Sequence, residues 1–153
     1  MSYAAINSQI LTVINTVSGI ANANDMPRWA TDQTDFDTKF LSGTIYHAWW
    51  IERVRTEAVF LGLGSELETQ EVFQIHGIYN QDDSNTSYKT MQGLVDGVLD
   101  GLNAIANVDL NNTGLVLSPA TLLSFVTERF PTQDGILMHK AIIEFPVKTL
   151  ESP

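Results

Sequence analysis

The stretch Glu71–Ile105, EVFQIHGIYNQDDSNTSYKTMQGLVDGVLDGLNAI, contains a predicted strand and a predicted helix around which the rest of the chain is organised. Near its start, Phe73, Ile75 and Tyr79 alternate with polar side chains, which predicts a strand that is apolar on one face only. After a polar loop, apolar residues recur at three- and four-residue spacing and predict a helix over Ser87–Ala106. The strand and the helix most simply bury their apolar sides against each other, and the other strands then extend the same sheet.

In the rest of the chain, the same patterns predict one more helix and two hairpins. The apolar spacing near the N-terminus predicts a helix over Tyr3–Val17, and glycine pairs or prolines punctuate the strands. The expected strands are Thr44–Leu61, Leu67–Tyr79, Leu115–Leu117, Leu122–Phe130 and Ile136–Val147. The predicted fold class is α+β: one mostly antiparallel sheet with a long hairpin, packed against an N-terminal and a central helix. At 153 residues, the chain is expected to form a single domain over 1–153.

The segment Ile20–Ser42 shows no clear periodicity and is interpreted as a long connection, anchored by Trp29, Phe36 and Phe40. Three aspartates in it, at 32, 35 and 37, do not match the spacing of an EF-hand calcium loop. Acidic loops are ordinarily solvated, so no metal is expected there.

The first strand of the long hairpin has large side chains of both parities. Trp49 and Trp50 must point in opposite directions, so one can enter the core while the other needs a second layer or a partner. A strand of about 18 residues would span about 60 Å, so part of the hairpin is expected to project or to bend at a bulge. Mixed charges gather toward its distal half. The candidate interface residues are Trp49, Trp50, Glu52, Arg53, Arg55, Glu57, Glu66 and Glu68.

No catalytic or metal centre emerges from the sequence. His76 falls on the polar face of its strand, His139 on an apolar face, and His47 in a strand of ambiguous facing, with no ligand spacing among them. There is no cysteine, no nucleophile elbow and no phosphate-binding loop. We therefore expect a protein that is not an enzyme and that holds neither metal nor cofactor.

The composition limits the kinds of partner that the chain is expected to bind. The apolar fraction of 44% and the charged fraction of 17% are typical of a globular protein, and the net charge of −10 argues against specific nucleic-acid binding. No apolar run is long enough to cross a bilayer, no secretory signal is visible, and the absence of cysteine is compatible with a reducing cytoplasm.

The order of elements resembles that of small tail-terminator, or tail-completion, proteins of long-tailed bacteriophages of the lambda type. The resemblance is carried by the N-terminal YAAINSQIL at 3–11, by WIER at 50–53, and by the block from FQIHGIY at 73–79 to QGLVDGV at 92–98. A C-terminal pair of strands also matches. It covers most of the chain through pattern and length, and the family has no active-site motif to transfer.

The resemblance implies a structural virion protein, assembled in the host cytoplasm, that forms a ring, commonly a hexamer. Such a ring caps the tail tube, contacts tube and head–tail connector proteins, and lets DNA pass without specific binding. Six copies would carry 6 × −10 = −60 formal charges, which would repel DNA from the lumen. The alternatives are a tail-tube subunit, a head–tail adaptor, or a non-viral α+β ligand-binding or host-factor domain.

Overall fold

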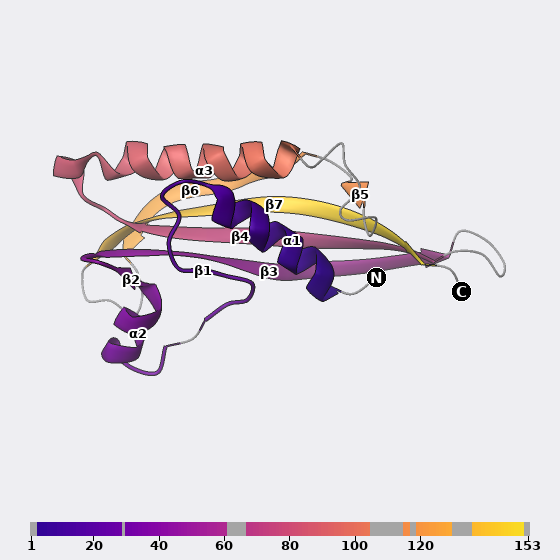
Figure 1. The fold of residues 1–153 in the computed structure, drawn as a ribbon, viewed down its shortest axis with the longest axis horizontal. Helices are drawn as coiled ribbons and strands as arrows, with labels where there is room; N and C mark the ends of the chain where they lie inside the picture. Colours follow the sequence, from indigo (N-terminus) through magenta and orange to yellow (C-terminus); the bar gives the residue numbers. More distant parts are fainter. Residues whose placement is uncertain are drawn as a thin grey trace.

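The computed structural model describes residues 3–28, 30–60, 67–104, 115–116, 119–129 and 136–151. Its architecture is α+β, as the sequence predicts: long antiparallel strands form a sheet, with α1 and α3 on one face (Figure 1). The elements in chain order are α1 (Tyr3–Thr16), β1 (Ala23–Asn24), α2 (Gln33–Phe40), β2 (Leu41–Ser42), β3 (Ile45–Phe60), β4 (Leu67–Asn80), a 3-10 turn (Asp83–Asn85), α3 (Ser87–Ala104), β5 (Leu115–Val116), β6 (Thr121–Arg129) and β7 (Leu137–Glu151).

Three long strands form the body of the sheet. β4 lies between β3 and β7 and pairs antiparallel with both along its length, from Leu67 to Asn80 on the β7 side. β6 and β5 share the other edge of β7, while β1 and β2 pair with the first residues of β3. The described strands thus follow the order β1-β3-β4-β7-β5. The two predicted hairpins are present and are joined into one sheet by the β4–β7 pairing.

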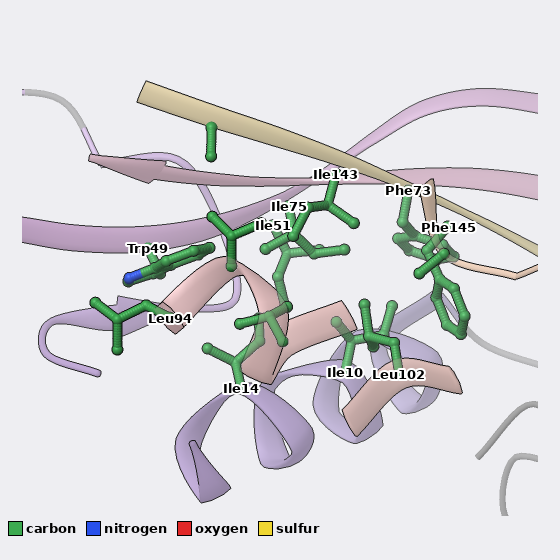
Figure 2. Close-up of a cluster of buried hydrophobic side chains, with 14 of the residues drawn as sticks. Ile10, Ile14, Trp49, Ile51, Phe73, Ile75, Leu94, Leu102, Ile143 and Phe145 are labelled. Carbon is green, nitrogen blue, oxygen red and sulfur yellow. The ribbon is translucent and has the colours of Figure 1, made fainter. Parts of the chain in front are cut away.

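The main core lies between this sheet and the two long helices. Figure 2 shows Ile10 and Ile14 of α1 and Leu94 and Leu102 of α3 facing a layer of strand side chains. That layer contains Trp49, Ile51, Phe73, Ile75, Ile143 and Phe145, all fully buried. Because β-strand side chains alternate, this one parity of β3, β4 and β7 defines the helix-covered face.

Glycines allow two close approaches in this core. A Cβ at Gly77 would lie 2.7 Å from the indole of Trp49 on the neighbouring strand, so the ring occupies the space that a side chain would need. Gly97 and Gly101 of α3 play the same part for α1, because a Cβ at either would lie 2.8 Å from Val17 or Val13. The two helices can therefore pack closely, as small residues at a helix contact allow.

The segment 20–42 is not a plain connection, and that interpretation is wrong. It contains β1, α2 and β2. Asp32 caps α2 by accepting a hydrogen bond from the backbone N–H of Asp35 at 2.8 Å, which satisfies a free donor of the first turn. The expected anchors Phe36 and Phe40 are buried, whereas Trp29 lies outside the described residues.

α2 makes a second, smaller core on the opposite face of the sheet. Phe36 and Phe40 pack against Ala48, Ile78 and Met138, whose parity is opposite to that of Trp49. This cluster covers only the end of the sheet where β3 begins. The predicted loop 107–114 and turns 62–65 and 131–135 lie wholly or mostly outside the described residues.

The distal end of the sheet extends past the helices. In Figure 1, β3, β4 and β7 continue beyond the ends of α1 and α3. β3 also carries a bulge at Val54, where the pairing register shifts between Arg53 and Arg55. The sequence predicted projection or a bulge for this long hairpin, and both features are present. No described helix is long and apolar enough to span a membrane.

Candidate assembly site

The outer edge of β3 carries most of the sequence-predicted interface residues. Beyond Trp50, β3 pairs with β4 alone among the described strands, so it forms an outer edge of the described sheet. The side chains of Glu52, Arg53, Arg55 and Glu57 are 34%, 41%, 56% and 58% exposed, respectively. Arg55 Nε lies 3.3 Å from Glu57 Oε1, and Arg53 Nη1 lies 3.5 Å from Glu71 Oε1. The structure therefore brings these four charges together on one edge.

Trp49 and Trp50 lie on opposite faces of the sheet, as alternation along a strand requires, and the prediction that Trp49 is an interface residue is wrong. Trp49 is fully buried beneath α1 and α3, so it cannot be an interface residue of this chain. Trp50 lies on the opposite face, half-buried next to Phe40, and its indole donates to Glu52 Oε1 at 3.2 Å. α2 supplies the second layer that Trp50 needs. Glu66 lies outside the described residues, as does the side chain of Glu68 in β4.

His76 is buried, although its strand face was interpreted as polar. Its ring stacks on Trp50 with centroids 5.4 Å apart, and neither ring nitrogen has a hydrogen-bond partner among the residues that the structure describes. Burial lowers the pKa of His76; Glu52, whose carboxylate lies 3.5 Å away, opposes this shift, and Lys140 adds to it. His76 is buried because Trp50 of β3 lies against it. Alternation along β4 alone does not predict which residue of β3 is its neighbour.

A second free edge, on β6, was not identified from the sequence. Among the described strands, β6 pairs only with β7, and most of its residues are exposed. Leu122, Leu123 and Val126 are 39%, 47% and 44% exposed, and a bulge at Leu123 breaks the register. The signal was present in the sequence: two consecutive leucines cannot both face one core from a regular strand. An exposed apolar edge strand of this kind is typical of a site that pairs with another chain.

A polar network holds the start of α3 against β6 and β7. Ser87 Oγ accepts from the Asp82 N–H at 2.7 Å and lies 2.9 Å from His139 Nε2, while Thr127 Oγ1 lies 2.7 Å from His139 Nδ1. Ser87 is only 2% exposed, so its hydroxyl does not reach solvent as a nucleophile would need to. Burial lowers the pKa of His139, with Asp83 opposing. The network ties α3 to β6 and β7.

A pocket of about 530 Å³ opens on the other side of α3, toward β3. Its walls include Ile45 and His47 of β3, Tyr79 of β4, and Lys89, Gly93 and Leu94 of α3. His47 is 4% exposed, and burial lowers its pKa to about 4, so its ring is neutral at neutral pH. His47 Nε2 accepts the indole proton of Trp49 at 2.9 Å, which leaves the ring hydrogen on Nδ1.

The described part of the chain holds no cluster of three or more His, Asp or Glu side chains that could bind a metal ion. The three histidines belong to separate environments: His47 at the pocket, His76 beside Trp50, and His139 in the Ser87 network. Within the described residues, therefore, the three histidines do not share one site.

No family model matches this chain, and no curated protein matches its sequence significantly.

Proposed function

We propose that this protein is a structural subunit that assembles head-to-tail into a ring, and that the ring serves as a tail terminator capping a phage tail tube and presenting the head-joining surface. The observation that carries the ring is that β3 and β6 are outer strands on opposite sides of the described sheet. The tail-terminator role itself rests on the resemblance in element order.

The two edges differ in chemistry, which favours a ring over a symmetric dimer. The β3 edge carries charges of both signs, and the β6 edge carries exposed leucine and valine. A two-fold dimer joins a patch to itself, whereas a head-to-tail contact joins two different patches and closes into a ring when the rotation allows it. Charge on one edge also disfavours pairing of that edge with itself.

The charge balance supports passage of DNA through such a ring. With a net charge of −10 per chain, the assembled subunits repel a polyanion at any surface that lacks a local cationic patch. A tail-tube subunit or a head–tail adaptor would share the ring, so capping is the property that separates them. A terminator stops tube growth, whereas a tube subunit extends it.

The direct test measures solution mass by light scattering and images the particles by negative-stain electron microscopy. We expect closed rings whose formation depends on the β6 edge. Leu123→Lys should leave the monomer folded and reduce ring yield tenfold or more, because it places a charge at the apolar edge. Gln92→Lys, which adds the same charge on exposed α3, is the matched control and should assemble normally.

Rings should then be added to purified tail tubes and to tube protein that is still polymerising. Capped tubes of fixed length that accept heads would support the terminator role. A chain that stays monomeric at all concentrations, or rings that neither bind nor arrest tubes, would contradict it.

A further inference from the structure

The pocket between α3 and β3 is closed on one side by the segment that follows α1, and contacts at both ends hold this segment in place. The chain turns away from α3 at Gly19, whose φ is +92° and whose Cβ, if present, would lie 3.3 Å from Leu94. Farther along, the Asn22 side chain donates to the carbonyl of His47 at 2.9 Å, and the Asn22 carbonyl accepts from the Trp49 N–H at 3.4 Å. The pocket is therefore formed before any ligand binds, and its volume of about 530 Å³ is typical of a small-molecule site.

The α3 wall of the pocket is bare helix backbone at Gly93. Gly93, Gly97 and Gly101 follow one another at four-residue spacing along α3. A Cβ at Gly97 or Gly101 would lie 2.8 Å from a valine of α1, whereas a Cβ at Gly93 would meet nothing within 4 Å. Ile45, which is 38% exposed, lines the same pocket from β3. The pocket thus has space and apolar surface for the body of a ligand.

A buried hydrogen-bond donor lines the pocket on the β3 side. His47 is only 4% exposed. The indole of Trp49 can only donate, so His47 Nε2 accepts from it at 2.9 Å and the ring hydrogen lies on Nδ1. This Nδ1–H has no acceptor among the described residues. Because a buried N–H without an acceptor costs stability, a ligand oxygen that accepts from Nδ1 would restore a favourable hydrogen bond.

The charges around the pocket favour an anion. None of the described residues that line it is aspartate or glutamate, although the chain has 18 of them. Lys89 lines the pocket on α3, and its ammonium has no ion-pair partner in the described part of the chain. Asp82 lines a smaller adjoining hollow, where its carboxylate accepts from Ser84 and Asn85. On a chain with a net charge of −10, this pocket is therefore locally positive.

We propose that this pocket binds a small carboxylic acid in its anionic form, one with an apolar body. The body lies against Gly93, Leu94 and Ile45, one carboxylate oxygen accepts from His47 Nδ1–H, and Lys89 supplies the opposite charge. The inference goes beyond the proposed ring and does not depend on it, because all these groups belong to one chain.

The donor groups favour a carboxylate over a phosphate. A phosphate is ordinarily held by several backbone N–H groups at a helix N-terminus or by arginine side chains. The described lining of the pocket has one lysine, one imidazole and a few hydroxyl groups, and no arginine. The single charge and two acceptor oxygens of a carboxylate match Lys89 and His47.

The test titrates benzoate, hexanoate, benzamide, acetate and inorganic phosphate into the full chain and follows binding by nuclear magnetic resonance. The indole N–H of Trp49 reports on the site, because it donates to the ring of His47. Benzoate or hexanoate should shift this resonance saturably. The tighter of the two should bind about fivefold or more tightly than benzamide, which has a ring and an acceptor oxygen but no charge. Acetate, which lacks the apolar body, and phosphate should also bind about fivefold or more weakly.

Two variants remove the apolar space and the charge separately. Gly93→Leu fills the pocket and should abolish binding of every probe, while melting at or above the wild-type temperature because leucine favours the helix. Gln92→Leu, at an exposed position on α3 outside the pocket lining, is its matched control and should bind as the wild type does. Lys89→Gln should weaken benzoate binding about fivefold and leave benzamide binding unchanged. Lys140→Gln, which removes the same charge on the α2 face of the sheet, controls for net charge.

Several results would overturn the carboxylate site. They are equal affinities for benzoate and benzamide, tighter binding of phosphate than of benzoate, wild-type benzoate binding by Gly93→Leu, or no saturable shift with benzoate or hexanoate up to about 10 mM. Light scattering on the same samples separates this inference from the proposed function. Wild-type rings that bind no carboxylate would overturn the site alone, whereas a monomer that binds benzoate would support the site and overturn the ring.

Discussion

The two faces of the sheet are built on different plans. The face under α1 and α3 is mainly apolar core, on which Trp49, Ile51, Phe73, Ile75, Ile143, Phe145 and Val147 are fully buried. The opposite face is apolar where α2 covers it, and one row past His76 it becomes polar, with Glu52, Gln74 and Glu144 side by side. The first face holds the domain together, whereas the second holds one small helix and leaves the rest of its surface to solvent or partners.

The largest effect should follow from placing a charge in the helix-covered core. Leu94→Asp buries an unpaired carboxylate at a site that is 7% exposed, and should destabilise the domain by several kcal/mol. Denaturant unfolding measures the loss. Gln92→Asp, two residues away on the exposed side of α3, controls for the charge itself. If Leu94→Asp unfolded at the wild-type midpoint, the core assignment would be wrong.

A substitution in the small core on the opposite face should destabilise α2 and leave the main core intact. Phe40 is 5% exposed and lies 4.7 Å from Phe36 and 6.3 Å from Trp50, between ring centroids. Phe40→Ala should cost about 3 kcal/mol in the stability of α2, the low end for a buried phenylalanine, because the small cluster can collapse. Hydrogen exchange should show lost protection in α2 and retained protection in α3. Thr34→Ala, exposed on α2, is the control, and loss of protection in both helices would contradict separate cores.

Much of this contrast could be predicted, but not all. The α1 and α3 stripes are long and periodic, so both helices and their buried faces follow from sequence. α2 has eight residues, all of them polar or charged except Phe36 and Phe40, and its Asp32 cap was interpreted as part of an acidic loop. Which tryptophan is buried depends on what β4 places opposite, since Gly77 admits Trp49 and His76 stacks on Trp50. Such cross-strand pairs are set by register, which a single strand does not reveal.

The candidate site, too, could be predicted only in part from the sequence. The charged residues of the β3 edge could be predicted from the sequence, because a long strand with large side chains of both parities leaves some of them outside the core. The β6 edge depends on where β6 lies, which in turn depends on the β4–β7 pairing between residues about 70 apart in the chain. The pocket depends on how the start of α3 packs over β3 and β4.

Acid should distinguish the two faces through their buried histidines. Burial lowers the folded-state pKa of His47 to about 4, from 6.5 in the unfolded chain. The unfolded state then binds more protons between these values, so stability is full above pH 6.5 and falls as the pH drops toward 4. The loss should reach about 3 kcal/mol by pH 4, since the two pKa values differ by about 2.5 and a difference of one corresponds to about 1.4 kcal/mol.

His47→Gln should flatten the dependence of unfolding free energy on pH across that window, because glutamine can still accept from Trp49 without titrating. His76→Gln should flatten it less, since Glu52 opposes the effect of burial on the pKa of His76. Equal slopes for His47→Gln and the wild type would show that His47 does not titrate with a lowered pKa.

The smallest effect on stability, and the one most specific to assembly, concerns the exposed charges of the β3 edge. Arg53→Glu combined with Arg55→Glu should leave the monomer folded, because partly exposed ion pairs such as Arg55–Glu57 contribute about 0–1 kcal/mol. The same double variant should lower ring yield or tail joining and change its salt dependence, because it turns a mixed edge wholly acidic on a chain that already carries a net charge of −10. Arg53→Lys with Arg55→Lys keeps the charge and should assemble as the wild type does. If the reversed pair still assembled with wild-type yield and salt dependence, the β3 edge would have no part in the contact. The segment 20–42, where α2 and β2 lie beside the start of β3, would then be the better candidate for that side of the interface.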